Sequence, residues 1–388
     1  MWNIIITGIG SLLTDISTEM FYPLISFYLL ALGAGPSILG FVEGIAESLA
    51  SLLKVYSGYI SDKIQKRKPL AILGYSFSSI GKVILYLAEN WVGIFIGRFI
   101  DRFGKGIRTA PRDAIIAESS KEKERGKSFG LHRAMDTIGA ALGVVLAIYI
   151  IKNFNLDETS NLKEYIPAFK SIILFSLIPA LLGVGILFLL KETGKSSSRG
   201  NLPSLKWKKL DPKLRAFLIF TFIFTLGNSS NQFLLLRAKT IEENIRITTV
   251  LSLYLLYNVI YAIFSFPAGY ISDKIGRKRV LVLGYLFYGL VYLGFAIANK
   301  FNVLVYLFVA YGLYIAFTEG VEKALISDLA PPETKATVIG LHATLVGIGL
   351  FPASLLAGLL WSYFGPQAPF YFGGFLGILA SIGLMSIL

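Results

Sequence analysis

The chain has 388 residues, of which 54% are hydrophobic and only 16% are charged, and its formal net charge is +13. Soluble domains carry roughly 25% charged residues, so this composition excludes an ordinary soluble protein and indicates a membrane protein. Because the chain has no cysteine, it also excludes a disulfide framework, a thiolate metal centre and a cysteine nucleophile.

Twelve segments are apolar enough, over about 20 residues each, to cross a bilayer. A helix suits hydrocarbon because it satisfies its own backbone hydrogen bonds. The sequence therefore predicts an all-α membrane protein with twelve transmembrane helices. The predicted spans are residues 3–32, 37–60, 69–89, 91–113, 127–151, 168–190, 216–238, 248–271, 279–298, 301–327, 335–361 and 369–388.

The two halves of the chain carry the same short sequences. Gly-Tyr-Ile-Ser-Asp occurs at residues 58–62 and again at 269–273, each time between an apolar run and a basic cluster. Gly-Leu-His also occurs twice, ending at His132 and at His342, which are the only histidines of the chain. Two repeats with substrate held between them are the architecture by which secondary transporters alternate access across a membrane. The repeat therefore predicts a transporter built from two equivalent halves.

The domain organisation follows from this repeat and from the loops. We expect two pseudo-symmetric six-helix bundles, residues 1–190 and 216–388, joined by a basic cytoplasmic linker at residues 191–215. With the N-terminus inside, the cytoplasmic loops hold 22 Lys and Arg residues, against 5 on the opposite side. This positive-inside pattern predicts that both termini are cytoplasmic. We expect the protein to lie in a prokaryotic inner membrane.

The basic loops also account for the net charge. Cytoplasmic Lys and Arg attract anionic lipid headgroups. No segment forms a soluble, aromatic-interleaved domain of the kind that reads nucleic acid. We therefore expect membrane lipid, and no nucleic acid, as the partner of these loops.

The first two predicted helices carry acids inside the membrane. Asp15 and Glu19 lie four residues apart in the first, and Glu43 and Glu47 repeat this spacing in the second, so each pair shares a helix face. Ionisable groups at this depth are costly and usually mark a substrate or proton pathway. Burial and nearby cations act on such acids in opposite directions, so some can titrate near neutral pH. We expect Asp15 and Glu19 to be the proton sites.

The fourth predicted helix carries a cationic stripe, because its ionisable residues fall within roughly 120° of one another at about 100° per residue. The stripe is expected to face the acids of the first two helices. Two interpretations stay open: salt bridges that lock six helices together, or a hydrated pathway for protons and substrate. The residues are Arg98, Asp101, Arg102, Lys105, Arg108 and Arg112.

His132 and Asp136 lie four residues apart in the fifth predicted helix. Histidine titrates in the physiological range, but His132 lies only a turn or two inside the membrane, so a capping or gate role is favoured. His342 is its counterpart in the second repeat. Two isolated histidines without further ligands argue against a zinc-type metal site.

The second half carries fewer charges in its predicted helices. A loose alignment places Asn228 and Gln232 where the first half has Asp15 and Glu19, and Glu319 is one of few acids. This asymmetry predicts proton coupling in the first half and a more apolar, aromatic substrate wall in the second.

The two basic loops resemble motif A of the major facilitator superfamily, and with twelve predicted helices in two repeats the resemblance covers the whole chain. It implies a cytoplasmic gate in which the aspartate and the basic residues bridge the two halves. The first copy departs from the pattern, because Gln65 stands where the family usually has glycine. The matching positions are Gly58, Asp62, Lys63, Lys66 and Arg67, then Gly269, Asp273, Lys274, Gly276, Arg277 and Lys278.

Three further sequence features bear on which kind of transporter within the superfamily the chain resembles. Arg98 resembles the motif B arginine, which the resemblance implies in proton coupling. Asp15 and Glu19 occupy a position similar to that of the helix 1 acids of drug-proton antiporters. The fifth helix has glycines at the spacing of the antiporter motif but lacks its proline, so antiport is suggested only in part.

These observations predict a secondary active transporter that moves a small organic solute by alternating access, with proton-coupled efflux as the first hypothesis. We expect a monomer without a cofactor. One alternative is an organic-anion or phosphate-ester carrier, by symport or uniport, that uses the cationic stripe. Another is a non-transporting membrane receptor. We find no nucleophile with its base, so we do not expect an enzyme, and no motif identifies the substrate.

Overall fold

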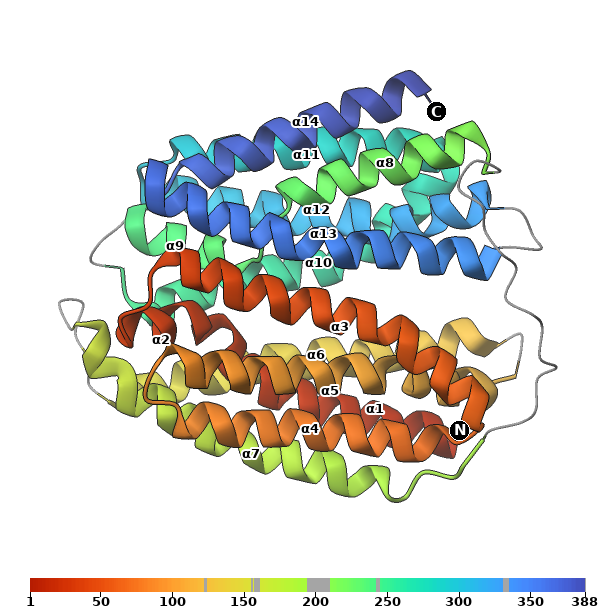
Figure 1. The fold of residues 1–388 in the computed structure, drawn as a ribbon, viewed down its shortest axis with the longest axis horizontal. Helices are drawn as coiled ribbons and strands as arrows, with labels where there is room; N and C mark the ends of the chain where they lie inside the picture. The colour runs from red at the N-terminus through yellow and green to blue at the C-terminus, as the bar shows by residue number, and fades with distance from the viewer. Residues whose placement is uncertain are drawn as a thin grey trace. The chain divides into compact units, whose positions relative to one another are not determined.

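The computed structural model describes residues 1–121, 124–154, 156, 161–193, 210–241, 245–330 and 335–387, and these contain helices and turns but no strand. The chain divides into two compact units, Met1–Ser198 and Arg199–Leu388. Within each unit the helices run nearly alongside one another (Figure 1). The all-helical prediction is therefore confirmed for the described residues.

Unit 1 holds six of the predicted spans. The first is interrupted by a short 3₁₀ turn that contains Pro23, since proline cannot donate a backbone hydrogen bond. Its elements are α1 (Trp2–Phe21), η1 (Tyr22–Leu24), α2 (Ile25–Ala31), α3 (Pro36–Ile64), α4 (Arg67–Leu87), α5 (Trp91–Glu118), α6 (Arg125–Lys152), η3 (Leu162–Tyr165) and α7 (Ile166–Leu187).

Unit 2 holds the other six spans. The seventh predicted span, residues 216–238, is wrong as a single helix, because the backbone leaves helical geometry between Gly227 and Gln232. The elements are α8 (Pro212–Gly227), α9 (Gln232–Ile241), α10 (Ile247–Ile275), α11 (Arg277–Ile297), α12 (Phe301–Leu329), α13 (Lys335–Phe364) and α14 (Ala368–Ile387).

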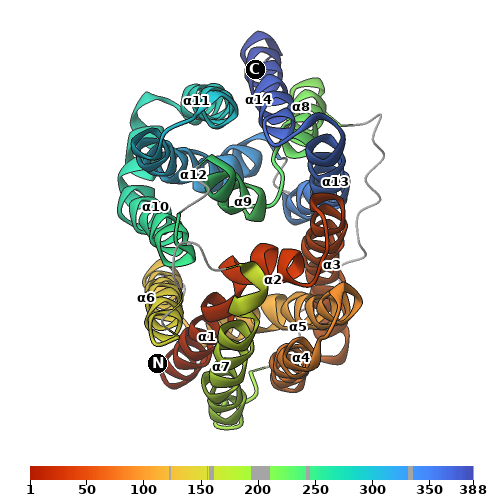
Figure 2. The same cartoon turned by 90° about the vertical axis from the view of Figure 1, so that its left-hand side faces the viewer.

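The two units share one packing plan. In unit 1, α5 packs between α3 and α4, and α1 packs between α6 and α7. In unit 2, α12 packs between α10 and α11, and α8 packs between α13 and α14. Figure 2 shows these three-helix groups of each unit end-on. Helices in equivalent places follow the same chain order, so the repeat predicted from the short matching sequences is a repeat of structure.

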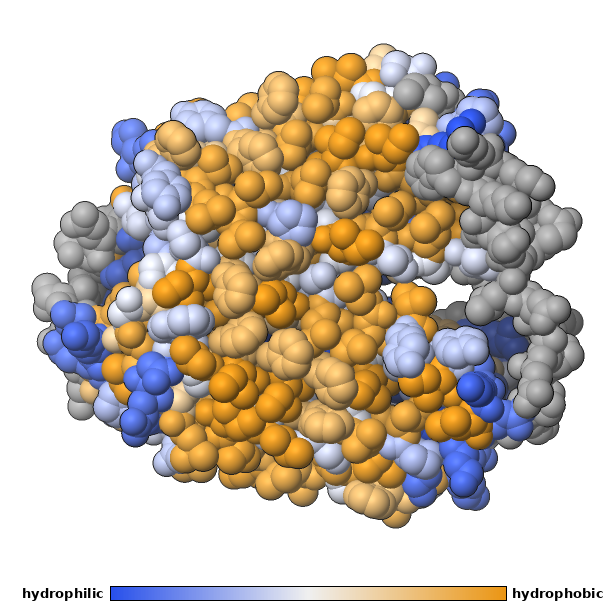
Figure 3. Space-filling view, viewed as in Figure 1, coloured by the Kyte–Doolittle hydropathy of each residue, from blue (hydrophilic) through white to orange (hydrophobic). Residues whose placement is uncertain are grey.

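Nine helical stretches in the described part of the chain are long and apolar enough to cross a membrane. The predicted spans outside this set are α3, α5 and the interrupted pair α8 and α9. Helix α3 carries Glu43 and Glu47, α5 carries the cationic stripe, and α8 and α9 are shortened by their break. The surface agrees with a membrane location, because apolar side chains cover the middle of the visible face and hydrophilic ones gather towards the helix ends (Figure 3).

Glycines set the close approach of α4 and α5. A Cβ atom on Gly81 would lie 2.7 Å from the Gly97 carbonyl oxygen, and one on Gly74 would lie 2.6 Å from that of Gly104. Gly139 and Gly143 of α6 likewise bring its backbone against α1, where a Cβ would meet the carbonyl oxygens of Leu12 and Ile16. Small residues of this kind let membrane helices pack backbone to backbone.

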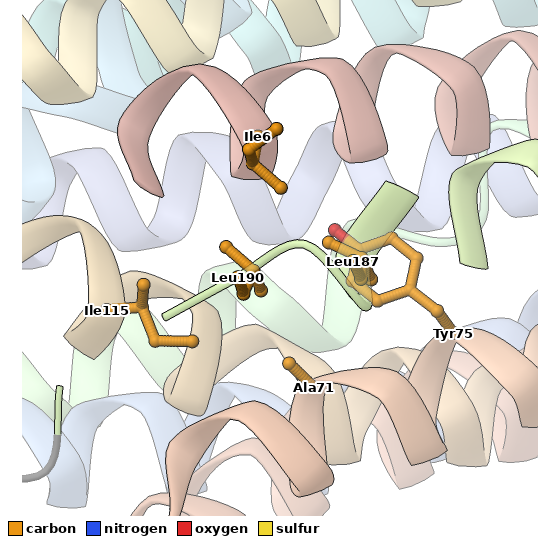
Figure 4. Close-up of a cluster of buried hydrophobic side chains, with 6 residues drawn as sticks. All are labelled: Ile6, Ala71, Tyr75, Ile115, Leu187 and Leu190. Carbon is orange, nitrogen blue, oxygen red and sulfur yellow. The ribbon is translucent and has the colours of Figure 1, made fainter. Parts of the chain in front are cut away.

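One end of unit 1 is sealed by an apolar cluster. It joins the N-terminal parts of α1 and α4 to the last turn of α5 and to the end of α7 with the residues that follow it, and all of its members are buried (Figure 4). The same end carries the first basic loop, so this packing fixes the beginning of α4, the helix that follows that loop. The cluster consists of Ile6, Ala71, Tyr75, Ile115, Leu187 and Leu190.

Candidate functional site

A buried ion pair joins α3 to α5 inside unit 1. The guanidinium of Arg98 donates from Nε to Glu43 Oε1 at 2.8 Å and from Nη2 to Glu43 Oε2 at 2.9 Å. Both side chains are at most 2% exposed. A bidentate arginine–carboxylate contact, with two parallel hydrogen bonds, is among the strongest forms of ion pair. It fastens the two helices together.

Other charges extend this pair into a network. Arg102 Nη2 lies 3.2 Å from Glu47 Oε1, and Asp101 Oδ2 lies 3.5 Å from Arg98 Nη1. From α4, Lys82 Nζ lies 3.9 Å from Asp101 Oδ1. The network joins three acids to three cations. The charges balance, as buried charges generally require.

Tyr22, at the interruption of the first span, covers this network. Its ring centroid lies 5.2 Å from the Cζ atoms of both Arg98 and Arg102. A cation over an aromatic face is attracted by the ring quadrupole. The bend in the first span is thereby fixed to the stripe on α5.

Asp15 lies outside this balanced network. Its side chain is half-buried on α1 and forms no hydrogen bond or ion pair with any other described residue. It interacts electrostatically with Asp136 of α6, with Arg108 of α5 and with Glu19 one turn further along α1. Two carboxyl groups from neighbouring helices are thus brought together near one guanidinium.

Lys105 and Arg108, further along the cationic stripe of α5, are less fully paired with acids than Arg98 and Arg102. Arg108 donates from Nη1 to Ser78 at 2.7 Å and lies over the Tyr75 ring, but its buried Nε has no partner among the described residues. Lys105 is exposed. Positive charge therefore remains available at this level of α5.

His132 and Asp136 are neighbours, as their spacing predicts, with His132 Nδ1 3.4 Å from Asp136 Oδ2. Arg112 donates to Asp113 and to Ser11 of α1. Among the described residues no group of three or more His, Asp or Glu side chains is placed to hold a metal ion.

The first basic loop is organised around Arg67. Its guanidinium lies 2.9 Å from Asp62 at the end of α3 and 2.7 Å from Glu118 at the end of α5, and it also donates to Ser61. Gly58 faces Ala110 of α5, where a Cβ would lie 3.3 Å away. The loop thus joins the ends of three helices. Lys63 and Lys66 are exposed.

The second loop repeats this arrangement. Arg277 lies 3.1 Å from Asp273 at the end of α10 and 2.7 Å from Asp328 at the end of α12. Lys274 lies over the ring of Tyr270 at 4.4 Å. Lys278 is half-buried, and nothing lies within 4 Å of a Cβ built on Gly269. The described ion pairs of each copy lie within its own unit.

The chain after α7 is tied to the same end of unit 1. Glu192 accepts hydrogen bonds from the backbone N–H groups of Arg67 and Lys68, which are the first residues of α4. Asn3 exchanges two hydrogen bonds with the backbone of Lys191. An acid at a helix N-terminus is favoured by the helix dipole. The predicted linker, residues 191–215, therefore begins with residues bound to unit 1, and residues 194–209 of it lie outside the described residues.

In unit 2 the break between α8 and α9 gathers amides and tyrosines. Asn228 donates to Tyr314 at 3.2 Å, and Asn231 donates to Tyr257 at 3.1 Å and accepts from Tyr311 at 2.6 Å. Gln232 is fully buried. Asn228 and Gln232, which align with Asp15 and Glu19, therefore differ from each other in burial: Asn228 is half-buried and Gln232 is fully buried.

Two acids of α12 are also engaged. Glu319 accepts from Tyr261 at 2.5 Å and from Lys323 at 2.9 Å. Glu322 accepts from Tyr285 at 2.7 Å and lies 2.8 Å from His342 Nε2. His342 thus meets an acid of α12, whereas His132 is beside an acid of its own helix.

Sequence reasoning missed several residues that these contacts bring in. Glu118, Glu192 and Asp328 complete the basic loops. Glu118 and Asp328 lie at helix ends, where acids are ordinary, and Glu192 lies in the segment after α7. Asn231 completes the amide cluster, and the run of five polar residues at 228–232 inside an apolar segment was the available signal.

Comparison with known proteins identifies the fold and family. A model of the Major Facilitator Superfamily matches residues 7–238 and 216–388. An uncharacterized MFS-type transporter of Methanocaldococcus jannaschii is 40% identical over 99% of this chain and 94% of its own length. Multidrug resistance protein MdtH of Photorhabdus laumondii is 22% identical over 96% of this chain and 91% of its own.

Solved structures agree on the fold. The nucleoside transporter NupG superimposes with a TM-score of 0.81 at 14% identity, over 100% of this chain and 99% of its own. A D-xylose-proton symporter superimposes with a TM-score of 0.79 at 16% identity, over 99% of this chain and 97% of its own. The chain is a multi-pass membrane protein that belongs to the major facilitator superfamily of secondary transporters.

Proposed function

We propose that this transporter exports a small organic solute in exchange for protons, across the inner membrane of a prokaryotic cell, as a monomer with cytoplasmic termini. The observation that carries the proposal is Asp15, a half-buried carboxyl inside the membrane that has no ion pair with any described residue. An ionisable group in that position is costly unless it works in a pathway. The name of the multidrug resistance relative supports export of organic compounds.

Asp15 and Asp136 form the proposed coupling pair. The two carboxyl groups repel one another electrostatically across α1 and α6, and a proton taken up between them would relieve that repulsion. Glu43 is held through both oxygens by Arg98, so we assign it to the structural clamp between α3 and α5. Glu19, one turn from Asp15, is the second candidate for proton exchange.

We propose that the two basic loops act as the cytoplasmic gate by stiffening the helix ends from which they emerge. Arg67 and Arg277 each hold the ends of two neighbouring helices through acids. Release of these pairs would let the ends separate. This role differs from the implied bridge between halves, since it needs only contacts within a unit.

Transport in proteoliposomes tests the proposal. Ethidium, a fluorescent organic cation, serves as the probe, and pyranine inside the vesicles reports proton movement. We expect ethidium flux to require a pH gradient and to be accompanied by proton counterflow. Asp15→Asn should reduce both by at least tenfold, whereas Glu164→Gln, in the capping box of η3, should leave both unchanged.

Two outcomes would overturn it. A flux that ignores the pH gradient and survives both Asp15→Asn and Glu19→Gln excludes these acids from coupling. Binding of probe without any counterflow would favour a receptor.

The second candidate function is organic-anion or phosphate-ester transport. It is favoured by the exposed Lys105 and by the buried Nε of Arg108, which lacks a partner among the described residues. Uptake of a phosphate ester such as glycerol 3-phosphate, lost in Lys105→Gln and insensitive to Asp15→Asn, would select this alternative.

A further inference from the structure

The break between α8 and α9 lies at membrane depth. Helix α8 has 16 residues and α9 has 10, so the break is about 24 Å from one end and about 15 Å from the other. Non-helical backbone inside a bilayer is tolerated where protein or a water-filled cavity surrounds it. In secondary transporters, interrupted helices mark places where substrate is held.

Asn231, in this break, has its carboxamide fixed from both sides. Its Nδ2 donates to the Tyr257 hydroxyl at 3.1 Å, and its Oδ1 accepts from the Tyr311 hydroxyl at 2.6 Å. Both tyrosines are 2% exposed, and their rings meet edge to face at 5.4 Å. The amide is therefore held in one orientation by side chains that are themselves buried and packed against each other.

The same amide has unused hydrogen-bonding capacity. A carboxamide offers two N–H donors and two oxygen lone pairs, and the contacts to Tyr257 and Tyr311 use one of each. Asn231 is half-buried, and neither its second N–H nor its second lone pair has a partner among the described residues. Asn228, also half-buried, uses an N–H on Tyr314 and leaves its oxygen without a partner among the described residues.

The direct hydrogen-bond partners of the two amides favour a neutral, flat ligand. The side chains of Asn228 and Asn231 bond to neutral hydroxyl groups. The tyrosines belong to an aromatic array in which Tyr311 also meets Tyr314 at 5.4 Å and Tyr292 at 6.4 Å. Aromatic walls with a few fixed polar groups are typical of sites for small organic molecules.

We propose that Asn231, assisted by Asn228, recognises a neutral planar ligand that carries a hydrogen-bond donor beside an acceptor, as in an aromatic carboxamide or a lactam. The free N–H and lone pair of Asn231 are complementary to such an edge. As a statement about the substrate, this inference rests on the proposed function, but binding of the ligand is testable without transport.

Binding to the purified protein in detergent, measured by calorimetry, tests the inference with three probes of similar size. Benzamide and nicotinamide carry the donor and the acceptor, and acetophenone carries only the acceptor. We expect the two amides to bind at least tenfold more tightly than acetophenone, because a site built for a polar edge rejects a ligand that leaves its groups unpaired.

Variants assign the preference to Asn231. Asn231→Leu should abolish the preference, and Tyr311→Phe should weaken it several-fold by freeing the amide to rotate. Asn258→Leu is the matched control, because the Asn258 amide on α10 bonds to the Tyr254 carbonyl of its own helix. It should keep the preference. Asn231→Asp removes the donor at constant shape and serves where Asn231→Leu fails to fold.

Equal affinity for the three probes in the parent protein, or an unchanged preference in Asn231→Leu and Asn231→Asp, would overturn the inference. Amide binding together with a nicotinamide flux that ignores the pH gradient would leave the inference intact and sink the proposed function. Coupled ethidium flux without amide preference would do the reverse.

Discussion

The Glu43–Arg98 pair shows how strongly a buried contact depends on both partners. Glu43→Gln leaves a guanidinium that is 2% exposed without its main counter-charge. Breaking such a pair costs about 3–5 kcal/mol, whereas replacing both partners by apolar residues is often neutral. We expect Glu43→Gln to lower the unfolding temperature strongly and Glu43→Leu with Arg98→Leu to restore part of the loss. A double variant no more stable than Glu43→Gln would show that Glu47 already compensates Arg98.

The residue that follows the last turn of the first helix differs between the two loops. Gln65 ends α3 with φ 54°, and it is the only described non-glycine residue with positive φ, while Gly276 ends α10 with φ 99°. A left-handed non-glycine residue costs roughly 1–2 kcal/mol. We expect Gln65→Gly to stabilise the protein slightly and Gly276→Gln to destabilise it, as measured by thermal unfolding in detergent. Destabilisation by both would mean that the Gln65 side chain has a role of its own.

Residue patterns predicted which charges would meet but not which would pair. Spacing places Glu43 and Glu47 on one face of α3 and the stripe on one face of α5, and these faces do meet. Helical periodicity predicts the face on which a residue lies but not how deeply its side chain is buried. It could not show that Glu43 is fully buried in an ion pair while Asp15 on α1 has no ion pair with a described residue.

At the scale of elements, the glycine contacts between α4 and α5 decide whether the charged network is buried. Gly104 approaches Gly74, and a Cβ built on Gly104 would lie 2.8 Å from the Ser78 backbone nitrogen, whereas Gly130 of α6 has nothing within 4 Å. Overpacking costs about 1–3 kcal/mol. We expect Gly104→Val to lower the unfolding temperature and the matched Gly130→Val to leave it nearly unchanged. Equal losses would assign the effect to helix propensity instead of packing.

Element boundaries were predictable wherever hydropathy changes sharply. The span predicted at 248–271 is α10 at Ile247–Ile275, and that predicted at 301–327 is α12 at Phe301–Leu329. The break between α8 and α9 was missed because a few polar residues barely alter the hydropathy of a long apolar window. Helices α3 and α5 have too many charged residues to pass a hydropathy criterion for a membrane span. Several of these charges pair with one another inside unit 1.

At the scale of the whole molecule, the repeat was the most reliable predictor. The paired short sequences identified α3 with α10 and α6 with α13, and the packing of the units follows that equivalence. The repeat could not predict which polar contacts form in each unit. Equivalent positions carry acids in one unit and amides or aromatics in the other, and their environments depend on neighbours that have diverged.

Membrane orientation belongs to this scale as well, and the chain suits its test because it has no cysteine. Lys66→Cys, Lys278→Cys, Glu89→Cys and Lys300→Cys each create a single thiol in a loop or at a helix end. The positive-inside pattern places the first two in the cytoplasm and the last two outside. In intact cells a membrane-impermeant maleimide should therefore label only Glu89→Cys and Lys300→Cys, and inverted vesicles should give the opposite result. The unmodified chain supplies a background without thiols. Labelling of Lys66→Cys in intact cells would reverse the orientation and place the gate loops on the outer face.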